Sequence, residues 1–221
     1  MHRNIDNLIQ IEKEIQLNIV KLNESVKLPK IIAVSKTHPM TSIQPLINHG
    51  HLDFGENKVQ EAFIKWHDIK QKTNNLNLHM IGRLQTNKVK QAISLFDFIH
   101  SVDNFKLAEK IANEQVKQDK KIKLFIQINI GEEAQKSGVE ISNLEKFYKS
   151  CIHDLGLDVI GLMCLPPNNW DTSQYFLKMK NLQTKFGLKE LSMGMSNDYL
   201  EALKFNSSYL RIGSKIFGQR N

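Results

Sequence analysis

Short apolar runs alternate with longer segments of helical character along this chain of 221 residues. Continuous apolar runs of this length are typical of strands that are covered on both faces. The runs cover residues 31–35, 52–54, 78–81, 97–101, 122–130, 158–163, 190–193 and 209–212. The segments between them fit helices over about 40–49, 57–72, 85–95, 104–119, 141–154, 172–185 and 197–206. This alternation indicates parallel β-α-β units.

An amphipathic helix is predicted before the first strand, because Ile15, Ile19, Leu22 and Val26 recur at helical spacing. Eight β-α units close naturally into a barrel. We therefore predict an α/β protein, a (β/α)8 barrel with an extra N-terminal helix. A doubly wound open sheet is the competing architecture, although no Gly-x-Gly-x-x-Gly phrase follows the first run. No linker-like stretch divides the chain, so we expect one domain over residues 1–221.

Composition adds little to this picture. The net charge is +7, but basic residues are interleaved with acids, as in Glu12-Lys13-Glu14. We expect no nucleic-acid partner, and an adaptor that binds nucleic acid or protein is kept as an alternative. The eight histidines lack metal-ligand spacing. No signal peptide is visible, no apolar run approaches the roughly 20 residues that span a bilayer, and the two cysteines form no motif. A cytoplasmic protein with reduced thiols is expected.

Lys36 follows the first apolar run and is the most informative residue of the chain. The carboxyl ends of barrel strands carry the ligand sites of this architecture. Partial desolvation of an ammonium there disfavours its charged form and leaves a nucleophilic amine, the kind that forms Schiff bases with carbonyl groups. The alternative is a lysine that leaves the core and extends into water.

Several phrases at the ends of strands occur in a specific order along the chain. They are Ala33-Val34-Ser35-Lys36, Gly55-Glu56-Asn57-Lys58-Val59-Gln60-Glu61, His79-Met80-Ile81-Gly82-Arg83-Leu84-Gln85-Thr86-Asn87-Lys88, Gly161-Leu162-Met163, Leu191-Ser192-Met193-Gly194-Met195-Ser196-Asn197-Asp198 and Arg211-Ile212-Gly213-Ser214-Lys215-Ile216-Phe217-Gly218. Taken in this order, the phrases resemble the pyridoxal phosphate homeostasis proteins, the single-domain relatives of the alanine racemase barrel. The resemblance implies a barrel of the alanine racemase N-terminal type, and the match runs from residue 33 to residue 220. One departure is Arg83, where members of the family usually have proline.

The resemblance implies that Lys36 holds pyridoxal 5′-phosphate (PLP) as a Schiff base. The phosphate needs N–H and hydroxyl donors, which Ser196, Ser192 and the backbone near Gly213 are expected to supply. Ser196 has the alternative role of a helix cap, Ser192 that of a buried serine bonded to backbone, and Gly213 that of a turn glycine.

Arg211 is expected to contact the pyridine nitrogen of PLP, as the matching arginine does in the alanine racemase relatives. A guanidinium cannot accept a hydrogen bond, so it favours an unprotonated ring nitrogen and a poorer electron sink. Asn57 is expected near the phenolic oxygen or the imine, and His79 on the third strand completes the predicted cofactor-binding set. The alternatives are a surface ion pair for Arg211, a helix cap for Asn57 and a core or supporting role for His79.

The leading hypothesis is a non-catalytic PLP carrier that buffers or delivers the cofactor and so affects amino-acid and keto-acid balance. A racemase needs acid/base groups on both faces of the substrate carbon. The racemase relatives take the second group, a tyrosine, from a further domain that we do not expect in this chain. A low-activity amino-acid racemase is the first alternative, and a Schiff-base aldolase is a distant one. Enzymes that lack their PLP are the expected recipients, and a monomer is expected from the family.

Overall fold

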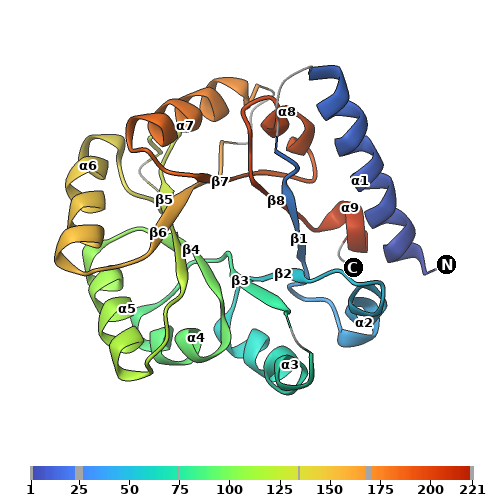
Figure 1. The fold of residues 1–221 in the computed structure, drawn as a ribbon, viewed down its shortest axis with the longest axis horizontal. Helices are drawn as coiled ribbons and strands as arrows, with labels where there is room; N and C mark the ends of the chain where they lie inside the picture. Colours follow the sequence, from blue (N-terminus) through green and yellow to red (C-terminus); the bar gives the residue numbers. More distant parts are fainter. Residues whose placement is uncertain (1, 23–26, 74, 134, 168–170, 220–221) are drawn as a thin grey trace.

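Eight parallel strands form a closed barrel in the order β1 to β8, each hydrogen-bonded to the next and β8 to β1 (Figure 1). This is a computed structural model, and it describes residues 2–22, 27–73, 75–133, 135–167 and 171–219. The closed barrel confirms the predicted fold class and excludes the open sheet. The strands are β1 (Lys30–Val34), β2 (Asp53–Glu56), β3 (Asn77–Met80), β4 (Phe98–Val102), β5 (Lys123–Ile128), β6 (Val159–Cys164), β7 (Glu190–Met195) and β8 (Tyr209–Ile212).

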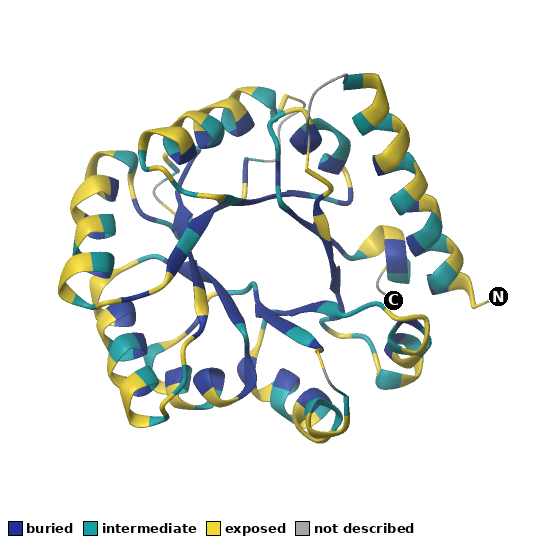
Figure 2. Cartoon of the chain, in the orientation of Figure 1, coloured by how far each residue is buried: buried dark blue, intermediate teal, exposed yellow. Residues whose placement is uncertain are grey.

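Helices surround the barrel, and their buried faces pack against the outer side of the sheet, as Figure 2 shows by colour. The 3₁₀ turn η1 (Thr86–Lys88) precedes α4, and the π-helical turn η2 (Ser150–Asp154) continues α6. The helices are α1 (Arg3–Leu22), α2 (Met40–Asn48), α3 (Val59–Lys72), α4 (Val89–Leu95), α5 (Phe105–Lys117), α6 (Ile141–Lys149), α7 (Ser173–Lys185), α8 (Tyr199–Leu203) and α9 (Ser214–Phe217).

Helix α1 confirms the predicted extra N-terminal helix and lies beside α9, α8 and α2, outside β8 and β1 (Figure 1). Ile11 and Ile15 on its inner face are buried. Asn7 Nδ2 donates to the carbonyl oxygen of Ile216 at 2.9 Å, and Asn4 Nδ2 donates to that of Ser42 at 2.8 Å. The helix therefore joins the start of the chain to α2 and α9. Val26, part of the predicted helical pattern, lies outside the described residues.

The interior of the barrel is filled by side chains, most of them aromatic. A cluster inside the barrel is formed by Ile32, Phe98, Phe125, Met163 and Tyr209. Two histidine rings, those of His79 and His100, complete this layer. The ring of His79 stacks on Phe98 at 4.3 Å between centroids, and that of His100 stacks on Phe125 at 4.2 Å. The barrel interior on the amino-terminal side of the strand ends is thus a packed core, as the fold requires.

Some local features differ from the sequence-based expectation. Helix α8 is shorter than the predicted 197–206 segment, and the four-residue helix α9 was not predicted. Strand β7 runs on to Met195, with an irregular register against β8 between Ser192 and Met195. Gly194, within this irregularity, has a φ of +89°. A left-handed residue lets the strand turn before it reaches α8.

In the part of the chain that the structure describes, no helix combines the length and the apolar character needed to cross a membrane. The same described residues contain no group of three or more His, Cys, Asp or Glu side chains placed to hold a metal ion.

Candidate functional site

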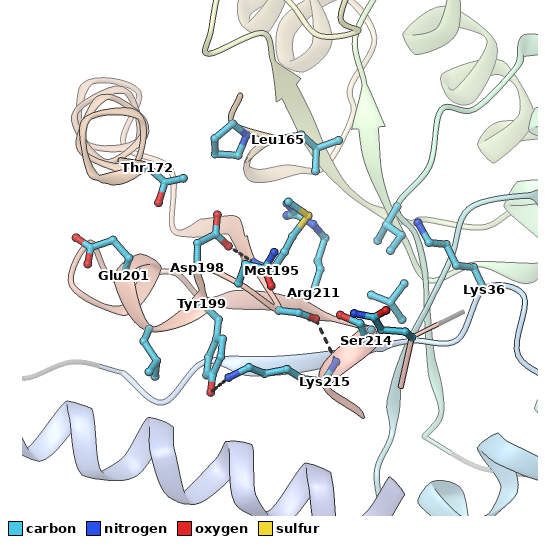
Figure 3. A pocket seen from close by; sticks show the side chains of 18 of the residues that line it. Lys36, Leu165, Thr172, Met195, Asp198, Tyr199, Glu201, Arg211, Ser214 and Lys215 are labelled. Atoms are coloured by element: carbon cyan, nitrogen blue, oxygen red, sulfur yellow. Dashed lines mark hydrogen bonds between the residues drawn. The ribbon is translucent and has the colours of Figure 1, made fainter. Parts of the chain in front are cut away.

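A cavity of about 1420 Å³ opens at the carboxyl ends of the strands (Figure 3). Its volume exceeds the roughly 300–1,000 Å³ that is typical of small-molecule sites. Five of the seven residues predicted to bind the cofactor line this cavity: Lys36, Asn57, Ser196, Arg211 and Gly213. The barrel topology therefore brings together groups that are up to 177 residues apart in sequence (213 − 36).

The backbone on both sides of Lys36 is held from outside the barrel. Lys65 Nζ on α3 donates to the carbonyl oxygen of Ser35 at 2.9 Å, and Glu61 Oε1 accepts from the amide of Thr37 at 2.5 Å. Thr37 has a φ of +66°, an uncommon conformation for a residue other than glycine. These contacts fix the turn that follows β1, and they point the Lys36 side chain toward the cavity that it lines.

The same side chains form a charged cluster between the sheet and α3, which we call the outer cluster: Glu56, Glu61 and Lys65. Glu56 is fully buried, and its Oε1 accepts from Ser35 Oγ at 2.7 Å, from Lys65 Nζ at 2.9 Å and from Trp66 Nε1 at 3.0 Å. Lys65 Nζ also lies 3.1 Å from Glu61 Oε1. A buried carboxylate with charge-assisted bonds is a fixed point for the neighbouring backbone.

Asn57 follows β2 and is packed against the β3–α4 connection. A Cβ atom on Gly82 would lie 2.4 Å from the Asn57 carbonyl oxygen, so only glycine allows this approach. Helix α3 begins at Val59 with Lys58 at its N-cap position. Asn57 is therefore not the helix cap that was its alternative role.

Arg211 is buried, with 4% of its surface exposed, and reaches the cavity from the barrel wall. Its Nη1 donates to the carbonyl oxygen and the hydroxyl of Ser192, each at 2.6 Å, and its Nη2 donates to the carbonyl oxygen of Cys164 at 2.8 Å. A guanidinium has further N–H donors beyond these. Arg211 therefore differs from the surface ion pair that was its alternative role, and it presents a fixed cation to the cavity.

Hydroxyl and amide groups gather in the part of the cavity where β7 and β8 end. Ser196 Oγ accepts from the amide of Lys215 at 3.4 Å, so it links the two loops. Asp198, not Ser196, is the N-cap residue of α8. Asp198 Oδ1 accepts from the amide of Met195 at 2.6 Å, and burial raises the pKa of its carboxyl group.

His79 and Ser192 are fully buried and lie below the cavity, outside the set of residues that line it. They belong to a row of hydrogen bonds inside the barrel, which we call the interior chain: Asp53, His79, His100, Ser192 and Arg211. Asp53 Oδ1 lies 3.1 Å from His79 Nε2, His79 Nδ1 lies 3.0 Å from His100 Nε2, and His100 Nδ1 lies 2.9 Å from Ser192 Oγ. Of the two predicted cofactor ligands, Ser192 thus contacts Arg211 directly, and His79 is linked to it through His100 and Ser192. The contact of either residue with a cofactor stays a prediction.

Sequence reasoning missed several residues of the site. Tyr199 and Lys215 line the cavity, Tyr199 Oη donates to Glu14 of α1, and Lys215 Nζ lies 3.3 Å from Tyr199 Oη. His100 was missed because it looks like a polar interruption of an apolar run. The Tyr199–Glu14 pair joins residues 185 positions apart, so no local sequence pattern predicts it.

Comparisons with known proteins identify the family. Residues 12–221 match the family model described as alanine racemase, N-terminal domain. The pyridoxal phosphate homeostasis protein of Aquifex aeolicus is 34% identical over 224 residues, which cover 97% of each chain. The protein of the same name from Pasteurella multocida is 35% identical over 225 residues, again 97% of each chain.

Solved structures give the same picture. PipY of Synechococcus elongatus, solved with PLP bound, superposes with a TM-score of 0.79 at 30% identity over 92% of this chain and 100% of PipY. An alanine racemase of Clostridium difficile shares the fold, with a TM-score of 0.71 at 16% identity over 99% of this chain and 57% of the racemase. The chain therefore belongs to the alanine racemase N-terminal domain family, in its group of pyridoxal phosphate homeostasis proteins.

Proposed function

We propose that this protein binds PLP as a Schiff base on Lys36 and buffers or delivers the cofactor inside the cell. The observation that carries the proposal is the placement of the Lys36 amine and the Arg211 guanidinium on one cavity at the carboxyl ends of the strands. The family assignment supports it, since a relative of similar length, PipY, was solved with PLP bound.

The donor set of the cavity suits a phosphorylated pyridine aldehyde. When bound, PLP supplies an electrophilic aldehyde and an aromatic ring that withdraws electrons. The Lys36 amine would meet the aldehyde, and the fixed cation of Arg211 would donate to the ring nitrogen. The hydroxyl of Ser196 and the backbone near Gly213 would receive the phosphate, and Asn57 would lie toward the ring oxygen. His79 and Ser192 would act through Arg211 rather than on the cofactor itself.

The alternative of an amino-acid racemase needs a second acid/base group, which in the racemase relatives is a tyrosine. Among the described residues that line the cavity, the candidate tyrosine is Tyr199. Its hydroxyl donates to Glu14, and burial together with that carboxylate raises the pKa of Tyr199 above its usual value. A phenol held in this way is poorly suited to accept a proton from a substrate.

The remaining parts of the proposal concern the setting of the protein. Cys151 and Cys164 are buried thiols, which suits the reducing environment of the cytoplasm. We infer a single domain over residues 1–221 that works as a monomer, because the cavity is built by one barrel. Enzymes that lack their PLP would be the recipients.

An absorption spectrum before and after borohydride reduction tests the cofactor and its anchor together. The cavity offers a matched control, because the described residues that line it include two lysines, Lys36 and Lys215. We expect a Schiff-base band in the wild type and in Lys215→Ala, its absence in Lys36→Ala, and a reduced pyridoxyl group on the peptide that contains Lys36. A label on Lys215, or no band in the wild type, would refute the proposal.

Delivery needs a separate assay. Loaded protein is mixed with an apo PLP enzyme in the presence of a scavenger of free PLP, and recovery of enzyme activity is followed. Recovery faster than from the same amount of scavenged free PLP supports transfer. Steady-state racemisation of amino acids by the pure protein, lost in Lys36→Ala, would support the racemase alternative instead.

A further inference from the structure

The interior chain crosses the whole barrel, from the end at which the strands begin to the cavity at the other end. Asp53 is the first residue of β2, and 16% of its side chain is exposed at that lower end. His79, His100 and Ser192 are fully buried, and Arg211 lines the cavity. Three strands between β2 and β8, namely β3, β4 and β7, contribute one residue each.

The hydrogen bonds of the interior chain all run in one direction, from donor to acceptor, when both histidines are neutral. A carboxylate can only accept, so His79 Nε2 must carry the proton that faces Asp53. The Nδ1 atom of neutral His79 is then an acceptor, which makes His100 Nε2 the donor between the rings. His100 Nδ1 accepts from the Ser192 hydroxyl, and Ser192 Oγ accepts from Arg211 Nη1. Every donor therefore points from the cation of Arg211 toward the anion of Asp53.

The surroundings favour this neutral state and hold the rings in place. Burial lowers the pKa of His79 and of His100, and the nearby Arg211 acts on His100 in the same direction. Each ring lies flat against a phenylalanine, and the edge of Tyr209 contacts His100 at 5.9 Å between centroids. Asp53 is itself held by Asn77 Nδ2 at 3.1 Å and by Lys30 Nζ at 4.0 Å. Hydrogen bonds and ion pairs thus hold both ends of the interior chain, and the packed rings of His79 and His100 have little room to rotate.

We propose that Asp53, His79 and His100 are positioning residues that, through Ser192, fix the orientation in which Arg211 faces the bound cofactor. Ser192 has one hydroxyl, and its proton is committed to His100, so its oxygen is left to accept from Arg211. Without His100 the hydroxyl is free to rotate, and Arg211 loses one of its three fixed acceptors. The consequence for the cofactor rests on the proposed function, whereas the direction of the chain does not.

The direction is tested on the protein without PLP, by nitrogen-15 NMR of protein labelled in histidine. We expect two histidines that keep the neutral Nε2–H tautomer across pH 6 to 8, assigned by their loss in His79→Phe and His100→Phe. A cationic His79, or a His100 with its proton on Nδ1, would overturn the proposal. This result does not depend on PLP. It therefore distinguishes an error in the inferred hydrogen-bond direction of the interior chain from an error in the proposed function.

The positioning role is tested by a double-mutant cycle read out as the dissociation constant of PLP. Loss of one hydrogen bond to a positioning group should weaken binding about threefold to tenfold in His100→Phe and in Ser192→Ala. The double variant should bind no more than about twofold more weakly than Ser192→Ala, because the same link is already broken. Met163→Leu, in the same interior layer and without a role in the chain, should change binding by less than about twofold. Losses that multiply in the double variant would refute the coupling.

Discussion

Replacement of Lys65 by methionine should destabilise the protein strongly, because it leaves the buried carboxylate of Glu56 without its cation. Glu56 is 0% exposed, and 10% of the Lys65 side chain is exposed. Removal of one partner of a buried ion pair costs about 3–5 kcal/mol. Glu56 keeps its bonds from Ser35 and Trp66, so we expect a loss at the lower end, about 3 kcal/mol.

Urea denaturation followed by fluorescence and circular dichroism measures this loss. Trp66 Nε1 donates to Glu56, so its emission reports on the cluster directly. Lys149→Met is the matched control, since Lys149 pairs with Glu145 at 2.9 Å on the surface, with 63% and 54% of the two side chains exposed. An exposed pair contributes about 0–1 kcal/mol, so the control should change stability little.

A second variant separates the charge from the packing of the lysine stem. In Glu56→Gln with Lys65→Met, the buried group is neutral and costs less to desolvate, so we expect recovery of about 1 kcal/mol or more relative to Lys65→Met alone. The reasoning is wrong if Lys65→Met destabilises the protein no more than Lys149→Met does. It is also wrong if the second substitution deepens the loss.

Three further predictions follow from local features of the chain. Gly194→Ala should lower the free energy of unfolding by about 1–3 kcal/mol, because its φ is +89° and a Cβ would lie 2.7 Å from that of Ala202. Gly187→Ala, with a φ of +63° and open space, should cost only about 1 kcal/mol by the same thermal or urea measurement. Burial lowers the pKa of His79 and His100, so the unfolded chain binds more protons below about pH 6.5. The free energy of unfolding should therefore fall as the pH drops from about 7 to 5, and the fall should be smaller in His100→Phe; an equal fall would contradict neutral histidines. Burial raises the pKa of Cys151 and of Cys164 to about 12, so neither thiol should react with a thiol reagent at pH 8 until urea unfolds the protein.

The barrel could be predicted from the sequence because its strands are buried on both faces. Such strands appear as continuous apolar runs, and the segments between them are long enough for crossover helices. Element ends were harder to predict. The run at 122–130 contains strand β5 only as far as Ile128, and the polar residue Asn129 already belongs to the loop. Helix α9 is too short to show any periodicity.

The site was predictable where it depends on topology alone. Lys36, Asn57, Ser196, Arg211 and Gly213 follow or end strands, and parallel strands place all such residues on one rim. The interior chain could not be predicted in this way. The contact between His100 and Ser192 spans 92 positions and depends on the stagger between strands that are not neighbours in the barrel. Sequence periodicity fixes which face a residue occupies, but it leaves the height along the barrel axis open.

The two proposed anchors of the cofactor are supported from opposite sides of the barrel wall. Lys36 is held by the outer cluster, in which charged side chains of α3 fix the backbone on either side of it. Arg211 is held by the interior chain, which starts at Asp53 at the far end of the barrel. The two networks meet in β2, where Asp53 faces inward and Glu56 faces outward, because odd and even residues of a strand point to opposite faces. A four-residue strand without a cofactor-binding residue therefore orients both anchors, and its charged residues serve the site from a distance.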